Sequence, residues 1–168
     1  MSALELRAEP AGGAASRALL DEYVALVQER LGAVGVEPGP RFFVTEDVFE
    51  RAGAAWLVAY EDGRPVGCGG LCTPEPGVGE IKRLFVAGAA RGRGYGRLLL
   101  RELERRALAA GHRRMRLLTA EVLGEASALY EAEGYAVVER VAVPDGPVEL
   151  EYGKRLLVDD EVGGRAEP

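Results

Sequence analysis

Polar and apolar residues repeat with two different periods along the chain, and these periods predict the strands and the helices. Alternating residues, or short apolar runs bounded by turn residues, predict β-strands. In the first half of the chain such stretches cover residues 3–8, 54–60, 64–73 and 79–87. Asp62 and Gly63 separate the second stretch from the third, and this dipeptide is typical of a tight hairpin turn.

The helical spacing of three to four residues appears in other stretches. We expect a first helix that Ser16 caps and Gly32 ends, and a shorter helical segment over residues 45–52. In the second half of the chain, an apolar stripe predicts a helix that ends at Gly111. Residues 124–133 predict one more short helix.

The strand expected over residues 113–121 determines the type of sheet. A helix connects it to the strand at residues 79–87, so the two strands must run parallel. Two final strands are expected over residues 134–141 and 148–157. The order β-α-α-β-β-β-α-β-α-β-β predicts an α/β (α+β) protein whose mixed sheet carries helices on its faces.

Length and composition place this pattern in one domain. The chain has 168 residues, of which 48% are hydrophobic, and we expect a single domain over residues 1–157. Residues 158–168 contain few apolar side chains and predict a flexible tail. The net charge of −6 disfavours nucleic acid and anionic membrane surfaces as partners.

Further features of the sequence predict a cytoplasmic protein. No apolar run approaches the roughly 20 residues of a membrane span, and the N-terminus lacks a signal-peptide pattern. Cys68 and Cys72 are the two cysteines, and their spacing matches no metal motif. We expect two small packed thiols on one face of a strand, and no metal site.

The stretch ARGRGYGRLL, residues 90–99, lies between a strand and a helix and holds three glycines. A Walker phosphate loop requires Lys-Ser or Lys-Thr, which the chain lacks. A dinucleotide fingerprint requires a third glycine where Arg97 stands. Two interpretations remain. The stretch is either a phosphate-binding turn with the pattern Arg91-x-x-Gly94-x-Gly96, or a flexible connector between the strand and the helix.

Physical chemistry makes this pattern a candidate anion site. Backbone N–H groups at a helix N-terminus converge on an anion and carry the positive end of the helix dipole. Gly94 and Gly96 would let a pyrophosphate approach the main chain, where a Cβ atom would collide. Arg91 and Arg93 would add charged hydrogen bonds to phosphate oxygens.

Residues 80–111, EIKRLFVAGAARGRGYGRLLLRELERRALAAG, and residues 126–135, ASALYEAEGY, resemble the GNAT superfamily of acetyltransferases. The resemblance implies a mostly antiparallel mixed sheet whose parallel pair splays apart at the cofactor site. It implies acetyl-CoA as co-substrate, without a metal. It also implies acetyl transfer to a primary amine of a small molecule, or to a protein N-terminus or lysine, by direct attack in a ternary complex.

The resemblance also implies site residues. Contacts to coenzyme A are expected from the main chain of Leu84, Phe85 and Val86, from the turn residues Arg91, Gly92, Arg93, Gly94, Tyr95 and Gly96, and from Tyr130. Tyr130 would give a proton to the leaving thiolate, since a phenol of pKa near 10 suits that transfer. The alternative is an aromatic side chain that only packs. Many family members carry asparagine where Leu123 stands, which puts one side-chain contact in doubt.

Glu80 is the candidate general base. It precedes Gly94 by fourteen residues, as the base does in similar family members. In a partly closed cleft its pKa would be raised. Simple alternation places Glu80, Lys82, Leu84 and Val86 on one face of the strand, and Ile81, Arg83 and Phe85 on the other. The alternative is a surface glutamate in an ion pair. His112, the single histidine, is expected to cap a helix C-terminus or lie on the surface.

Two other functions remain open. A non-catalytic acyl-CoA-binding regulatory domain would have the same fold, because fold does not settle function. A nucleotide-binding protein is disfavoured by the glycine spacing. Acceptor specificity is expected to come from residues 31–47 and 142–148, and a homodimer is possible, as in many members of the family.

Overall fold

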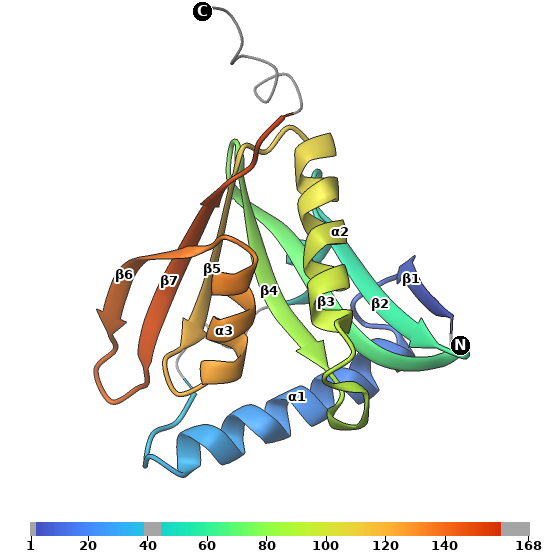
Figure 1. Ribbon diagram of the computed structural model, residues 1–168. Coiled ribbons are helices and arrows are strands. Elements are labelled where there is room, and N and C mark those ends of the chain that lie inside the picture. Colours follow the sequence, from blue (N-terminus) through green and yellow to red (C-terminus); the bar gives the residue numbers. More distant parts are fainter. Residues whose placement is uncertain (1–2, 39–44, 159–168) are drawn as a thin grey trace, which may run out of the picture.

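A computed structural model describes residues 3–38 and 45–158, and one seven-stranded sheet organises them (Figure 1). The strands are β1 (Leu4–Ala8), β2 (Ala55–Glu61), β3 (Arg64–Glu75), β4 (Val78–Val86), β5 (Arg114–Ala120), β6 (Ala136–Ala142) and β7 (Val148–Arg155). The α-helices are α1 (Ala14–Gly32), α2 (Tyr95–Ala109) and α3 (Gly124–Ala132), and two short 3₁₀ helices are η2 (Glu46–Phe49) and η3 (Gly88–Ala90). The tail predicted at residues 158–168 lies, beyond its first residue, outside the described part.

The sheet is mixed, as predicted from the element order. Its strand order is β1-β2-β3-β4-β5-β7-β6, and every neighbouring pair is antiparallel except β4 and β5. Helix α2 connects the two parallel strands, which is the reason that they must run in the same direction. No helix among the described residues is long and apolar enough to span a membrane.

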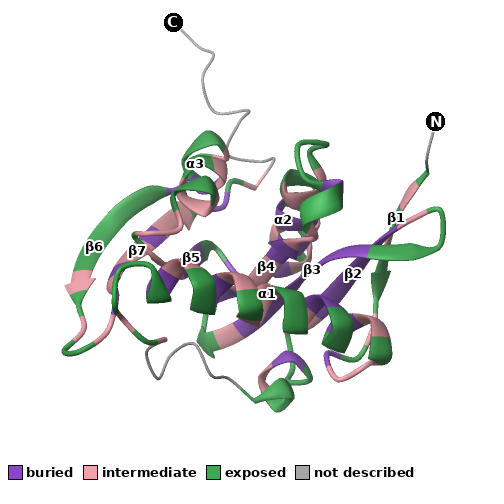
Figure 2. Ribbon diagram, turned by 90° about the horizontal axis from the view of Figure 1, so that it is seen from below, coloured by how far each residue is buried: buried purple, intermediate pink, exposed green. Residues whose placement is uncertain are grey.

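Helices cover both faces of the sheet. Figure 2 shows α1 on one side, and α2 and α3 on the other. The core on the α2 side includes Leu99, Leu103 and Tyr130, and the core on the α1 side includes Trp56, Cys68, Cys72 and Phe85. Both cysteines are buried and free, which confirms the expectation of packed thiols.

Strands β4 and β5 separate part of the way along their length. They pair over only four residues each, from Val78 with Arg114 to Ile81 with Leu117. Beyond Ile81 they diverge into a V that opens toward α1 (Figure 1). The main chain of β4 after Ile81 therefore keeps β3 as a neighbour on one side and, among the residues that the structure describes, has no strand partner on the other.

A β-bulge in β4 changes the faces predicted by simple alternation. The pairing with β3 shifts between Phe85, opposite Cys68, and Lys82, opposite Gly70, and Arg83 adopts a left-handed φ of 55°. One extra residue on β4 reverses the orientation of everything after it. The prediction was therefore wrong beyond the bulge: Leu84 and Val86 pack on the α2 side, with Ile81, whereas Phe85 packs on the α1 side.

Two further side chains differ from the sequence-based expectations. Ser16 is no cap, because α1 begins at Ala14; it is fully buried, and its Oγ accepts a hydrogen bond of 2.9 Å from Trp56 Nε1. His112 is 4% exposed and lies 3.2 Å from Thr73 Oγ1, so it is not a surface residue. Its backbone N–H does bond to Ala107 O, just after Gly111 (φ 91°), and thereby caps α2 as expected.

The close contact between η2 and β3 allows a test of the packing in the α1-side core. A Cβ atom at Gly70 would lie 2.2 Å from Phe49 Cε1. We expect Gly70→Ala to cost about 1–3 kcal/mol of unfolding free energy through overpacking. Gly32→Ala is the control, because open space surrounds Gly32 at the end of α1, and we expect it to be neutral or slightly stabilising. Denaturant unfolding of both variants measures the difference; equal stabilities would contradict the packing described.

Candidate active site

A cavity of about 580 Å³ lies where β4, α2 and α3 meet above α1. Nine of the residues predicted to hold a cofactor line it: Leu84, Phe85, Val86, Arg91, Gly92, Gly94, Tyr95, Gly96 and Tyr130. Glu80 and Arg93 are not among the residues that line it. The structure thus brings the end of β4, the glycine turn and Tyr130 to one place.

The glycine turn carries the chain from η3 into α2. Gly92 and Gly94 have φ angles of 76° and 80°, which are left-handed values that side chains other than glycine adopt at a cost. Gly94 is the N-cap residue of α2, and no side chain caps this end of the helix. The first N–H groups of α2 have no intrahelical acceptor, and Tyr95 and Gly96, the first two residues of the helix, line the cavity.

Close packing explains why residue 96 is a glycine. A Cβ atom at this position would lie 3.3 Å from Leu129 Cδ2 and 3.6 Å from Val86 Cγ2. By contrast, nothing lies within 4 Å of a Cβ atom at Gly92 or Gly94. Gly96 therefore lets α3 approach α2, and the open space beside Gly92 and Gly94 is what a bound anion would need.

The two arginines of the turn have different neighbours. Arg91 Nε donates a hydrogen bond of 3.0 Å to Val86 O, and its guanidinium lies 5.7 Å from the centre of the Phe85 ring. Arg93 donates to both carboxylate oxygens of Glu61 at 2.7 Å, away from the cavity. Of these two arginines, Arg91 is thus the one that is held at the cavity wall.

Tyr130 stands between two cavities. It lines the large one and also a smaller chamber of about 120 Å³ that α1, β4, β5, α3 and the start of β7 surround. Its ring packs against Tyr135 and Tyr152, each with a centroid distance of 5.9 Å. Burial raises the pKa of Tyr130 above the value near 10 that the sequence argument assumed, so its phenol keeps its proton at neutral pH.

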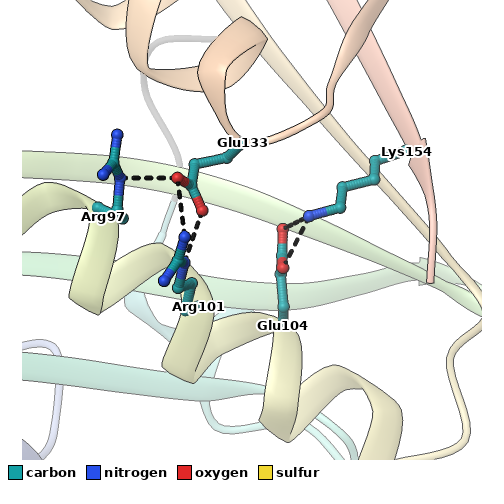
Figure 3. A network of polar contacts seen from close by, with 5 residues as sticks. All are labelled: Arg97, Arg101, Glu104, Glu133 and Lys154. Atoms are coloured by element: carbon teal, nitrogen blue, oxygen red, sulfur yellow. Dashed lines mark hydrogen bonds and ion pairs between the residues drawn. The ribbon is translucent and has the colours of Figure 1, made fainter. Parts of the chain in front are cut away.

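A network of ion pairs clamps the end of α3 against α2 (Figure 3). Glu133 follows Tyr130 by three residues, and its carboxylate lies 2.7 Å from the Nε atoms of both Arg97 and Arg101. Figure 3 shows the second pair, in which Lys154 of β7 reaches Glu104 of α2 at 2.9 Å. The helix that carries Tyr130 is thereby fixed to the helix that follows the glycine turn.

Glu80 lies deep between β4 and β5, where the two strands still pair. It is 3% exposed, one carboxylate oxygen lies 2.5 Å from Lys82 Nζ, and the other accepts a hydrogen bond from Arg116 Nε. Burial alone would raise the pKa of Glu80, but Lys82 and then Arg116 outweigh it, and its pKa is lowered. The expected raised pKa was wrong. The alternative interpretation, a surface glutamate in an ion pair, was right about the ion pair and wrong about the surface, because Glu80 is buried.

Other lining residues were missed in the sequence. Arg97 lies in the first turn of α2 and lines the large cavity, although the sequence singled it out only as the wrong residue for a dinucleotide loop. Arg97 follows Gly94 by three residues, which is nearly one helical turn, and this spacing was a signal in the sequence that Arg97 lies near the glycine turn. Tyr23 and Val27 reach both cavities from α1. No local motif announces these two residues, because the V between β4 and β5 places α1 beneath the cavities. Leu123, the position at which the sequence put one side-chain contact in doubt, lines both cavities.

Comparisons with known proteins agree with this geometry. The family model described as Acetyltransferase (GNAT) family matches residues 17–135, more than half of the chain. An IAA acetyltransferase of Azospirillum brasilense is 43% identical over 82 residues. The match covers 48% of this chain and 54% of that protein, so the chain spans about half the length of this curated relative.

Solved structures show the same fold over nearly the whole chain. An acetyltransferase from Streptococcus agalactiae has a TM-score of 0.72 and 20% identity, and the match covers 91% of this chain and 98% of that one. A GNAT family acetyltransferase from Elizabethkingia anophelis, solved with acetyl-CoA bound, has a TM-score of 0.65 and 16% identity, with coverage of 91% and 98%. Together with the matched family model, these findings show that the chain belongs to the GNAT family of acetyltransferases.

Proposed function

We propose that this protein transfers an acetyl group from acetyl-CoA to the primary amine of an acceptor that sits in the smaller chamber. The observation that carries the proposal is the place of Tyr130, which lines both the large cavity beside the glycine turn and the smaller chamber. Tyr130 shares this position with Tyr23, Val27, Leu84, Leu123 and Ala126, and it is the one of these residues that the family resemblance places at the reacting sulfur. The family match and the relative named as an acetyltransferase support the same reaction.

The large cavity fits coenzyme A in its chemistry. The uncapped N-terminus of α2 and the open space beside Gly92 and Gly94 suit a pyrophosphate. Arg91 and Arg97 line the same cavity and would add charged hydrogen bonds. Beyond Ile81, the edge of β4 that faces β5 has no strand partner within the described ranges 3–38 and 45–158, so the main chain of Leu84 to Val86 can pair with an extended amide-containing arm.

Bound acetyl-CoA would supply the acetyl thioester. The neutral amine forms the new C–N bond as the C–S bond breaks; an ammonium and the thioester thus yield the amide, a thiol and one released proton. Tyr130 gives its phenolic proton to the leaving sulfur and recovers one from the new amide nitrogen. A main-chain N–H of the segment from Leu84 to Val86 stabilises the negative charge on the carbonyl oxygen.

The proposed role of Glu80 follows from its contacts. Both of its carboxylate oxygens are occupied by Lys82 and Arg116, so it is a weak acceptor for the proton of an acceptor amine. We assign to Glu80 the task of joining β4 to β5 at the closed end of the V. The acceptor then loses its first proton to water, and its second passes to Tyr130.

Replacing the phenol tests its role. We expect Tyr130→Phe to slow turnover by a factor of about 10²–10⁴, the usual contribution of a positioned proton donor, with little change in acetyl-CoA binding. Tyr60→Phe removes a phenol on β2 that lines neither cavity, and it serves as the matched control. Release of free thiol in the presence of an amine panel measures both. An unchanged rate for Tyr130→Phe would refute the assignment, and no release from the unmodified protein would favour a non-catalytic acyl-CoA-binding domain.

A substitution that introduces a negative charge tests whether the glycine turn binds the phosphates of acetyl-CoA. A glutamate at Gly94 points a carboxylate into the open space where phosphate would bind, and we expect Gly94→Glu to weaken acetyl-CoA binding more than about 100-fold. Gly77 has nearly the same backbone, with a φ of 79° and open space around it, but lies at the other end of β4. Gly77→Glu therefore controls for backbone strain. Calorimetric titration with acetyl-CoA should separate the two variants; similar affinities would show that the cofactor binds elsewhere.

Glu80→Gln separates a structural role from a catalytic one. We expect a loss of about 1.5–3 kcal/mol of unfolding free energy near neutral pH, because two charged hydrogen bonds weaken. The folded-state pKa of Glu80 is lowered, so its stabilisation is present above the ordinary value of 4.5 and disappears as the pH falls through the folded-state value. The stability difference from the unmodified protein should vanish in acid. If turnover at full acetyl-CoA saturation instead fell about a hundredfold or more, Glu80 would be identified as the base.

A further inference from the structure

The glycine turn is anchored to a strand that lies outside the cavity. Arg93 Nη1 donates to both carboxylate oxygens of Glu61 at 2.7 Å, and the Tyr95 hydroxyl donates a hydrogen bond of 2.5 Å to one of the same oxygens. Arg93 and Tyr95 stand on either side of Gly94, the N-cap residue of α2. One carboxylate of β2 therefore holds both sides of the position at which the helix begins.

The strand β2 directs Glu61 to this place. Ala59 packs on the α2 side of the sheet and Tyr60 on the α1 side, so alternation along the strand puts Glu61 on the α2 side. Glu61 is the last residue of β2. The two residues that follow, Asp62 and Gly63, have φ angles of 49° and 77°, as a two-residue hairpin turn requires. The hairpin thus fixes where the carboxylate lies.

The turn itself offers little that would order it. Gly92 and Gly94 adopt left-handed φ angles, and glycine loses more conformational freedom on folding than any other residue. Among the described residues, no side chain caps the helix that begins here. Arg91 Nε, bonded to Val86 O, holds the first residue of the turn, and the contacts of Glu61 hold its last. The conformation of the turn therefore depends on side chains that reach out to neighbouring strands.

The contacts of Glu61 also decide which side chains of the turn meet the cavity. Arg93 is not among the described residues that line the cavity, although Gly92 and Gly94 on either side of it are. Tyr95 lines the cavity while its hydroxyl is bonded to Glu61. The carboxylate thus keeps one arginine of the turn away from the cavity and holds a tyrosine in the cavity wall.

We propose that Glu61 is a positioning residue for the cofactor: through Arg93 and Tyr95 it holds the glycine turn in the conformation that receives the phosphates of acetyl-CoA. This inference rests on the proposed binding of acetyl-CoA and adds to it a residue outside the cavity. A site that is ordered before its ligand arrives loses less conformational freedom on binding, and it binds more tightly for that reason. Glu61 is not among the described residues that line either cavity, so it acts on cofactor affinity and not on the transfer step.

Removing the carboxylate of Glu61 has effects of opposite sign. The variant loses a negative charge near the phosphates and releases Arg93 toward them, and both changes favour binding. It also loses the anchor on either side of Gly94, which disfavours binding. Arg93 is half-exposed, so water and salt screen its charge, and the loss of the anchor dominates. The direction of the change in affinity therefore tests the proposal.

Calorimetric titration with coenzyme A measures that direction. We expect Glu61→Gln to weaken binding about tenfold, the size of one charged hydrogen bond. Glu102→Gln is the matched control, because it removes the same charge from a carboxylate that also pairs with two side chains, Arg105 and Arg106. Glu102 lies farther along α2 and is not among the described residues that line either cavity, so its variant should bind within about twofold of the unmodified protein. Thermal unfolding shows that each variant folds.

A donor without phosphates separates the turn from the rest of the site. S-acetylpantetheine carries the thioester and the amide-containing arm but no pyrophosphate. With an acceptor amine and thiol release as the readout, we expect Glu61→Gln to raise KM for acetyl-CoA about tenfold without lowering kcat. Its kcat/KM for S-acetylpantetheine should stay within about twofold of that of the unmodified protein, because the turn does not bind this donor.

A combined variant tests the route of the effect. If Glu61 acts through its two partners, it has nothing to position once both have lost their polar groups. In a protein that already carries Arg93→Met and Tyr95→Phe, we expect Glu61→Gln to change the affinity for coenzyme A by less than about twofold. A further tenfold loss in that protein would show that Glu61 does not act through Arg93 and Tyr95, and would overturn the inference.

The outcomes distinguish this inference from the proposed function. Unchanged or tighter binding of coenzyme A by Glu61→Gln would overturn the inference, and thiol release by the same variant would still support acetyl transfer. An equal loss with S-acetylpantetheine, or with Glu102→Gln, would also overturn it, because the effect would then be general. Weaker binding by Glu61→Gln alone, in a protein that releases no thiol, would support the inference and contradict acetyl transfer. Absence of coenzyme A binding to the unmodified protein would overturn both.

Discussion

The separation of β4 from β5 is the constraint on which the rest of the structure depends. A parallel pair normally continues for the length of its shorter strand, because each unpaired N–H and C=O group in the interior is costly. Here the pairing stops after Ile81 and Leu117, two residues before the bulge position Arg83. The opening leaves a strand edge exposed to a cavity and lets α1 reach both cavities from below (Figure 1).

Ion pairs stabilise both ends of this opening. At the closed end, Glu80 links Lys82 of β4 to Arg116 of β5. At the open end, Glu133 holds Arg97 and joins α3 to the first turn of α2 (Figure 3). These partly buried pairs define the positions of elements more than they add to stability, since the cost of desolvating charges offsets much of their attraction. Tyr130 is positioned between them by α3.

The sequence predicted the fold because the signals for it are local, and the glycine turn together with the family resemblance predicted half of the residues that line the large cavity. Strand and helix periods, the helix end at Gly111 and the parallel pair all follow from residues within one element or its connection. The faces of β4 could not be predicted, because a bulge at an arginine leaves no mark in the pattern. Ser16 was misinterpreted for a related reason: its partner, Trp56, is forty residues away, and only the tertiary packing brings the two together.

The same bulge shapes the walls of both cavities. Without it, Leu84 and Val86 would face α1 with Lys82. With it, Leu84 and Val86 pack toward α2 together with Ile81, while Phe85 packs toward α1. Ile81 and Leu84 still line the smaller chamber beside Lys82 and Arg83, so apolar and cationic side chains of β4 lie next to each other in its wall. One inserted residue therefore sets the faces of β4 at the point where its pairing with β5 has ended.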